Sequence, residues 1–216
     1  MIGTVGKRLT KLYNYYKELE INIPSVFFDI YRKEKCQLDN TNITNRIEVL
    51  DRYEISYEHK KIIDKWLTDL KLPQLDYAVY FKTFSSNKQG QIVKYHIDYN
   101  AKLDCIVKCA LNIPLCNCDD SVIVWTGSNY VTNKAWYDKS GKWIISKEKY
   151  NEFNIPALHV EQEVDDFNYY YFSQKNPYVL NTCIPHKALV GNKERHLISL
   201  RLKGNYTFEK MWNLTN

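Results

Sequence analysis

Apolar side chains between residues 57 and 71 recur at the spacing of an amphipathic helix, and Leu72-Pro73 ends the pattern. The stripe consists of Ile62, Ile63, Trp66, Leu67 and Leu70. A similar pattern predicts a helix over residues 4–20, ended by Asn22-Ile23-Pro24. We expect the helix over residues 57–71 to cover one face of a sheet.

From Asp76 onward the period changes from helical spacing to the alternation of a strand. The pattern predicts strands from Asp76, over 91–98, 104–115 and 122–126, and near 157–163, 168–172, 178–182 and 195–203. Lys139-Ser140-Gly141 predicts a hairpin tip between Trp136 and Trp143. About eight short strands after a helical half indicate a mainly β fold of the double-stranded β-helix, jelly-roll or cupin type.

We therefore interpret residues 1–216 as a single domain. Residues 1–75 would form a helical support, residues 76–203 the jelly-roll core and residues 204–216 a C-terminal tail. The net charge of +5 permits an anionic substrate without demanding nucleic acid. Lysines and Arg8 interrupt the start of the chain and no long apolar run follows, so we expect a cytoplasmic protein without signal peptide or membrane span.

Six cysteines are present, and Cys105, Cys109, Cys116 and Cys118 fall within fourteen residues. Four cysteines this close together are a candidate zinc site. However, the group contains no Cys-x-x-Cys pair, and two of its members lie in an alternating strand. We expect free thiols without a disulfide and without zinc.

Two polar residues of one predicted strand, His96 and Asp98, are two positions apart and therefore share a face. A second imidazole would complete a face of two histidines and one carboxylate, a ligand set typical of non-haem Fe(II). His186, after the strand-like run 178–182, is the best candidate for this imidazole. Arg195 follows nine residues later and opens another strand, where a guanidinium could hold a carboxylate by two hydrogen bonds.

This series of residues resembles the Fe(II)/2-oxoglutarate-dependent dioxygenases over roughly residues 76–203. Two surrounding segments strengthen the resemblance: Ala110-Leu111-Asn112-Ile113-Pro114-Leu115, and Asn181-Thr182 before Pro185-His186-Lys187. The resemblance is to the phytanoyl-hydroxylase-like and aspartyl-hydroxylase-like members. It implies Fe(II) on His96, Asp98 and His186, and 2-oxoglutarate with its far carboxylate on Arg195. It also implies O₂ as co-substrate, hydroxylation of a C–H bond, and release of succinate and CO₂. The substrate, a small molecule or a peptidyl side chain with nucleobases not excluded, is not readable from the sequence.

Other candidates remain at the site. Arg201 shares a strand face with Arg195 and is the alternative carboxylate anchor or a substrate contact. Asn112 and Lys108 share a face that we expect to line the pocket, and Lys108 is a further carboxylate candidate, as a strand lysine is in the Jumonji-type relatives. His159 is a rival for the place of His186. Weaker pocket candidates are Tyr80, Tyr95, Thr126 and Asn181, while Trp125 and Trp136 fit a core.

Two other classes of function are open. A jelly-roll module could bind without catalysis, with His96 and His186 in structural roles. A cupin isomerase or hydrolase could use the same metal without a keto acid, and it would not need a buried Arg195.

Overall fold

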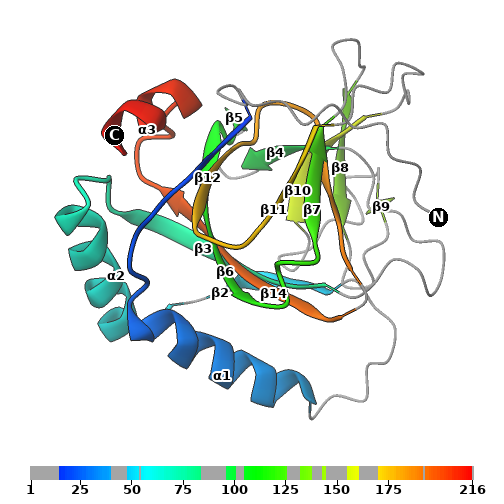
Figure 1. Ribbon diagram of the computed structural model, residues 1–216. Coiled ribbons are helices and arrows are strands. Elements are labelled where there is room, and N and C mark those ends of the chain that lie inside the picture. Colours follow the sequence, from blue (N-terminus) through cyan, green and yellow to red (C-terminus); the bar gives the residue numbers. More distant parts are fainter. Residues whose placement is uncertain are drawn as a thin grey trace.

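The computed structural model describes residues 15–39, 48–53, 55–83, 96–100, 105–125, 132–137, 143–144, 155–160, 170–191 and 193–215. Over these residues the protein is mainly β, with two antiparallel sheets and three helices. The sheets lie face to face, and α1 and α2 lie outside the first sheet (Figure 1).

The first sheet has six strands in the order β1-β12-β6-β14-β3-β2. Their bounds are β1 Tyr16–Glu18, β2 Glu48–Tyr53, β3 Leu75–Thr83, β6 Cys109–Cys116, β12 Tyr178–Asn181 and β14 Arg195–Leu202. Strand β14 is central, because it pairs with β3 on one side and β6 on the other. Apart from β2 and β3, neighbouring strands of this sheet are distant in sequence, so the chain crosses repeatedly between the two sheets.

The second sheet follows the order β11-β7-β13-β4-β10-β8-β9, with β5 paired to β4. The bounds are β4 His96–Asn100, β5 Cys105–Ile106, β7 Val122–Trp125, β8 Thr132–Tyr137, β9 Trp143–Ile144, β10 Ile155–Val160, β11 Tyr170–Ser173 and β13 His186–Leu189. Strands β4 and β13 are neighbours, with His96 opposite His186. Strands β8 and β9 pair Trp136 with Ile144, as the expected hairpin requires, although residues 138–142 lie outside the described part of the chain.

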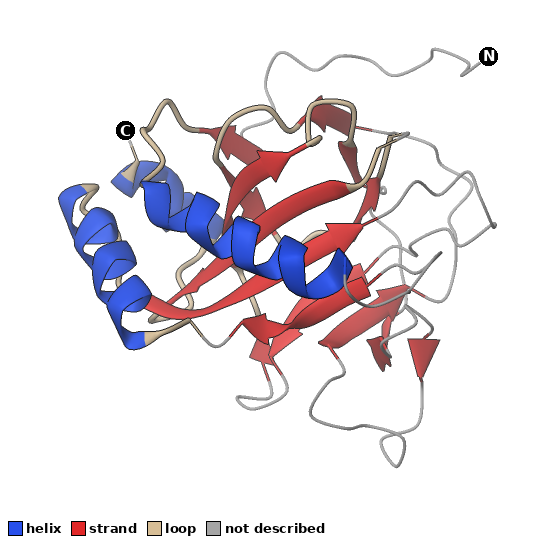
Figure 2. Cartoon of the chain, turned by 90° about the horizontal axis from the view of Figure 1, so that it is seen from below, coloured by secondary structure: helices blue, strands red, loops and turns tan. Residues whose placement is uncertain are grey.

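Helices α1 (Ser25–Asp39), α2 (Tyr57–Asp69) and α3 (Phe208–Leu214) pack on the first sheet (Figure 2). The helix predicted over residues 57–71 is confirmed as α2, whose first turn is capped by Ser56 Oγ accepting from the His59 amide. The main core lies between helices and sheet. It includes Phe27, Ile30, Ile63, Leu67, Leu111, Ile113, Ile198, Leu200, Phe208 and Met211.

The faces predicted for β14 are confirmed. Ile198 and Leu200 belong to the core under the helices, and Leu197 belongs to a second cluster that joins the two sheets. Trp125 of β7 and Tyr178 of β12 are fully buried in the same second cluster. One face of β14 thus packs against helices, and the other faces the second sheet.

Several sequence expectations are corrected. The helix expected over 4–20 is wrong where it can be checked: Tyr16–Glu18 form β1, because pairing with β12 outweighs local helical spacing. Helix α1 was not predicted, since its apolar positions are concentrated in its first turns. The single strand expected over 104–115 is divided into β5 and β6. The expected tail carries α3, whose Phe208 and Met211 are in the core.

None of the helices in the described part of the chain is long and apolar enough to span a membrane.

Candidate metal centre

Three side chains from two neighbouring strands of the second sheet, β4 and β13, meet at one place. His96 and Asp98 lie two apart on β4, and His186 opens β13 directly opposite His96. Their potential ligand atoms all lie within 4.8 Å of one another. Asp98 Oδ1 is 3.7 Å from His96 Nε2 and 3.8 Å from His186 Nε2. Among the described side chains this is the group that could hold a metal ion.

The backbone fixes the ring of His186. Its Nδ1 lies 2.9 Å from the Ile184 carbonyl oxygen, so Nδ1–H donates and the Nε2 lone pair is left for a ligand. The ring centroids of His186 and His96 are 4.7 Å apart. Burial, together with the nearby charge of His96, lowers the pKa of His186 to about 4. At neutral pH the imidazole is therefore uncharged, as metal ligation requires.

Asp98 uses its two oxygens differently. Oδ1 faces the imidazoles, whereas Oδ2 accepts from Arg201 Nη2 at 2.5 Å. Burial favours a raised pKa for Asp98, but Arg201, and after it His186 and His96, bring the pKa below its usual value. The carboxylate is ionised at neutral pH, with one oxygen open to a cation and the other oriented by a guanidinium.

Behind Arg201 the hydrogen bonds continue along the inner face of β14. Arg201 Nη1 donates to Ser199 Oγ, which donates to Asn112 Oδ1 on β6. Asn112 and Ser199 are both buried and directly opposite in the strand pairing. The expected pocket residue Asn112 therefore lies in the chain of contacts that supports Asp98.

Arg195, at the other end of the same face, has a different environment. It is 3% exposed, and Nη2 donates to Gln174 Oε1 at 2.5 Å. Gln174 Oε1 also accepts from the Tyr178 hydroxyl. In the described part of the chain, Arg195 Nε and Gln174 Nε2 are buried without an acceptor, and no carboxylate pairs with Arg195. A buried guanidinium with a neutral amide as its partner is costly unless an anion joins it.

The carboxylate nearest to Arg195 in sequence is held on the opposite face of the sheet. Glu194 Oε2 lies 3.2 Å from Lys82 Nζ, and Oε1 lies 2.5 Å from His196 Nε2. His196 Nδ1 is 2.7 Å from the Tyr80 hydroxyl. The expectation that His196 faces away from Arg195 is confirmed, and Tyr80 belongs to this outer network rather than to a pocket.

The other predicted site residues lie elsewhere. Lys108 is exposed and lies between β5 and β6, with its amide donating to Asn205 Oδ1. Asn181 Oδ1 accepts from the Cys183 amide at the end of β12. His159 is on β10, directly opposite His96 in the strand pairing, and its side chain lies outside the described residues. Tyr95 and Thr126, and the side chain of Trp136, lie outside the described residues.

Two cysteines in or near β6, Cys109 and Cys118, donate to backbone oxygens. Cys109 Sγ lies 3.0 Å from the Tyr206 carbonyl oxygen, and Cys118 Sγ lies 3.0 Å from that of His196. Burial raises the pKa of both thiols, that of Cys109 to about 12. Both are therefore protonated donors at neutral pH. The side chain of Cys105 lies outside the described residues.

Gln174 is the main residue of the site that the sequence did not indicate. It precedes β12, and no local motif marks it. Its role is visible only when β12 is placed against β6 and β14. Ser199 was placed on the correct face, but its bonds to Arg201 and Asn112 depend on the same strand pairing.

The donor set fits a divalent cation. Two imidazole nitrogens and one carboxylate oxygen converge from one side, which is the ligand set of non-haem Fe(II). Bonds of about 2.1 Å would bring neighbouring ligand atoms to about 3 Å. The separations of 3.7 and 3.8 Å would shorten by less than 1 Å on binding.

No protein-family model matches this chain, and no curated protein matches its sequence.

Proposed function

We propose that the protein is an Fe(II)- and 2-oxoglutarate-dependent dioxygenase that hydroxylates a C–H bond. The observation that carries the proposal is Arg195, buried without a carboxylate partner in the described part of the chain, on the strand face that also carries Arg201 beside the three metal-ligand candidates. A dicarboxylic co-substrate could bind at both places. Its keto acid end would bind the metal, and its far carboxylate would pair with Arg195.

The strand order supports the fold on which the proposal rests. The sequence β12-β6-β14-β3 in one sheet and β11-β7-β13-β4 in the other accounts for eight antiparallel strands in two facing sheets. Such an arrangement is what a double-stranded β-helix requires. The ligand-bearing strands β4 and β13 then lie in one sheet and the anchoring strand β14 in the other.

The residues have separate tasks in this proposal. His96, Asp98 and His186 would hold the metal, and the Ile184 carbonyl and Arg201 would orient two of these ligands. Arg195 and Gln174 would offer the co-substrate their buried donors, Nε and Nε2, which have no acceptor among the described residues. Trp125, opposite His186 in the strand pairing, and Tyr178 would exclude water between the two ends. The bound iron would supply oxidation by O₂ coupled to decarboxylation of the keto acid.

The test is an anaerobic titration of the protein with Fe(II) and then 2-oxoglutarate. We expect the weak visible absorption band of an iron–keto acid chelate, saturating at one equivalent of each. Iron binding without this band would favour the alternative of a metal-dependent isomerase or hydrolase. No iron binding at all would favour a non-catalytic binding module.

A further inference from the structure

A cavity of about 190 Å³ lies where β14 ends and α3 begins. Its walls are largely apolar, with Val107, Leu202, Tyr206 and Met211 among them. Two charged residues also line it: Arg201, which is 7% exposed, and Asp76, which is exposed. This volume accommodates a hydrocarbon group of several carbon atoms.

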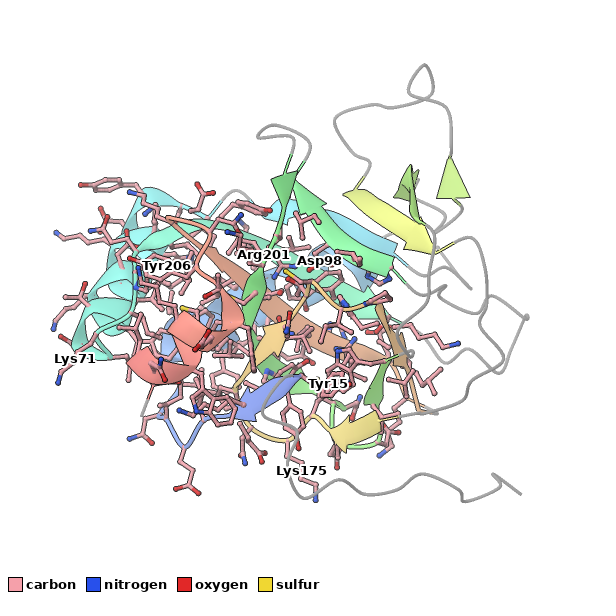
Figure 3. All side chains as sticks on the ribbon, turned by 90° about the horizontal axis from the view of Figure 1, so that it is seen from above. Tyr15, Lys71, Asp98, Lys175, Arg201 and Tyr206 are labelled. Atoms are coloured by element: carbon pink, nitrogen blue, oxygen red, sulfur yellow. The ribbon has the colours of Figure 1, made fainter. Side chains whose placement is uncertain are left out.

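Arg201 connects this cavity with the candidate metal centre. In Figure 3, Arg201 lies between Tyr206 of the cavity wall and Asp98. Its contacts with Asp98 and Ser199 use two of the five N–H groups of a guanidinium. Arg201 thus has further donors for a ligand that enters from the cavity.

Two other polar side chains of the cavity wall, Asn205 and Cys109, are engaged in the fold. The Asn205 side chain accepts from the Lys108 amide and donates to the Ile106 carbonyl oxygen. The Cys109 thiol donates to the Tyr206 carbonyl oxygen. We expect a ligand in the cavity to be recognised mainly by Arg201 and by the apolar wall.

Charged side chains of both signs lie around the cavity. Lys210 Nζ lies 4.2 Å from the centroid of the Tyr206 ring, which lines the cavity. Asp76 and Lys210 are both exposed, so water and salt screen both charges. A divalent cation on Asp98 would weaken the pairing of that carboxylate with Arg201 and leave more of the guanidinium charge for a second anion.

We propose that this cavity is a substrate subsite that takes a carboxylate on a short hydrocarbon body, with the carboxylate on Arg201 and the body against Leu202 and Met211. The inference rests on the proposed function, because it assigns the cavity to the substrate of the same metal centre. It also makes binding of the acid and binding of the metal mutually favourable, since both compete with the same Arg201–Asp98 pair.

The probes are isovalerate, a carboxylate on a short branched hydrocarbon, and isovaleramide, its neutral isostere. Binding is measured by calorimetry to the full chain, metal-free and loaded with Co(II) and 2-oxoglutarate. Met211→Trp and, separately, Leu202→Trp fill the cavity from two walls, and Ile62→Trp on the exposed face of α2 is the matched control. The visible Co(II) spectrum and circular dichroism report whether each variant is folded.

We expect saturable binding of isovalerate to the loaded protein, about tenfold or more weaker binding of the amide, and weaker binding of the acid without metal. Either folded cavity-filling variant should lose about tenfold or more in affinity for the acid, and Ile62→Trp should lose none. Equal binding of acid and amide, or no loss in a folded cavity variant, would overturn the subsite. Failure of Co(II) to bind would instead count against the metal centre itself, which separates the two proposals.

Discussion

Strand β14 carries two buried arginines on one face, and their surroundings differ in charge. Arg201 pairs with the Asp98 carboxylate at 2.5 Å, whereas Arg195 donates to the neutral side-chain oxygen of Gln174. The two residues are 7% and 3% exposed, so solvent compensates neither charge effectively. One guanidinium therefore completes an ion pair within the chain, and the other is suited to an anion from outside.

The comparison shows that burial and residue type do not decide what an arginine does. At the Arg201 end, a carboxylate is available because β4 places Asp98 across from the end of β14. At the Arg195 end, the neighbouring carboxylate of Glu194 is held by Lys82 and His196 on the opposite face. We propose that Arg201 supports a candidate metal ligand, Asp98, and that Arg195 is a binding group for an anion.

The largest effect is expected from Asp98→Ala. The change removes one of the three proposed metal ligands and leaves Arg201 buried without its carboxylate, so metal binding should be lost. We expect the free energy of unfolding of the metal-free protein to fall by about 3–5 kcal/mol, as when one partner of a buried pair is removed. Urea denaturation of the metal-free protein and calorimetric Co(II) titration measure the two effects.

Asp69→Ala is the control for Asp98→Ala, because Asp69 pairs with Lys65 on the exposed surface of α2. It should cost less than about 1 kcal/mol. The double variant Asp98→Ala/Arg201→Met should recover part of the lost stability, since it removes the uncompensated charge. If Asp98→Ala is no more destabilising than Asp69→Ala, the Arg201 end of the comparison is wrong.

The second expected effect is a dependence of stability on pH. It arises at the Arg201 end of β14, where His186 lies beside Asp98. The pKa of His186 is about 4 in the folded protein and about 6.5 when unfolded. Between these values the unfolded chain binds more protons, so the metal-free protein should lose stability as pH falls from 6.5 to 4. The loss is on the order of 3 kcal/mol.

Unfolding of metal-free protein followed in urea at several pH values checks this. In His186→Gln the stability should depend less on pH over the same window. In Arg195→Gln the dependence should remain, because no histidine adjoins that guanidinium on its own face of the sheet among the described residues. A pH dependence lost in Arg195→Gln but retained in His186→Gln would contradict the assignment.

The third effect concerns co-substrate binding. Arg195→Lys should weaken 2-oxoglutarate about ten- to hundredfold, because a lysine cannot reproduce the two-pronged contact and a lost charge-assisted bond is worth about 1.5–3 kcal/mol. Arg201→Lys should change 2-oxoglutarate binding much less and weaken Co(II) binding instead. The 2-oxoglutarate dependence of succinate release and the Co(II) titration, measured for both variants, decide the matter. If only Arg201→Lys showed a large loss of 2-oxoglutarate affinity, Arg201 would be the co-substrate anchor and the assignment of Arg195 would be wrong.

Part of this site was predictable from the sequence because it depends on local spacing. The two-residue period put His96 and Asp98 on one face, and the alternation in 195–202 put Arg195 and Arg201 on one face and His196 on the other. Helix α2 was predictable for the same reason. These relations hold along one element and need no knowledge of its neighbours.

The remainder depends on pairing between strands that are far apart in the chain. Tyr16 joins β12 near the other end of the sequence, so its local helical pattern was misleading. The roles of Arg195 and Arg201 were left open because Gln174, Asp98 and Glu194 reach them, or are kept from them, through tertiary contacts. The exposure of Lys108 likewise follows from the break between β5 and β6, which the alternation did not reveal.

The smallest effect tests why Arg195 has no carboxylate. If Lys82 helps to hold Glu194 on the outer face, Lys82→Met should free Glu194 Oε2 and let this carboxylate compete for Arg195. His196 still holds Oε1, so the competition should be partial, and 2-oxoglutarate binding should weaken by about three- to fivefold, less than 1 kcal/mol. Adding Glu194→Gln removes the competing charge, so the double variant should regain most of the affinity despite the loss of Lys82. The measurement is 2-oxoglutarate titration of the Co(II)-loaded protein, with Lys65→Met on the exposed face of α2 as the control for losing a lysine. Equal binding by Lys82→Met and the double variant would mean that Glu194 does not compete, and that the geometry of β14 alone keeps it from Arg195.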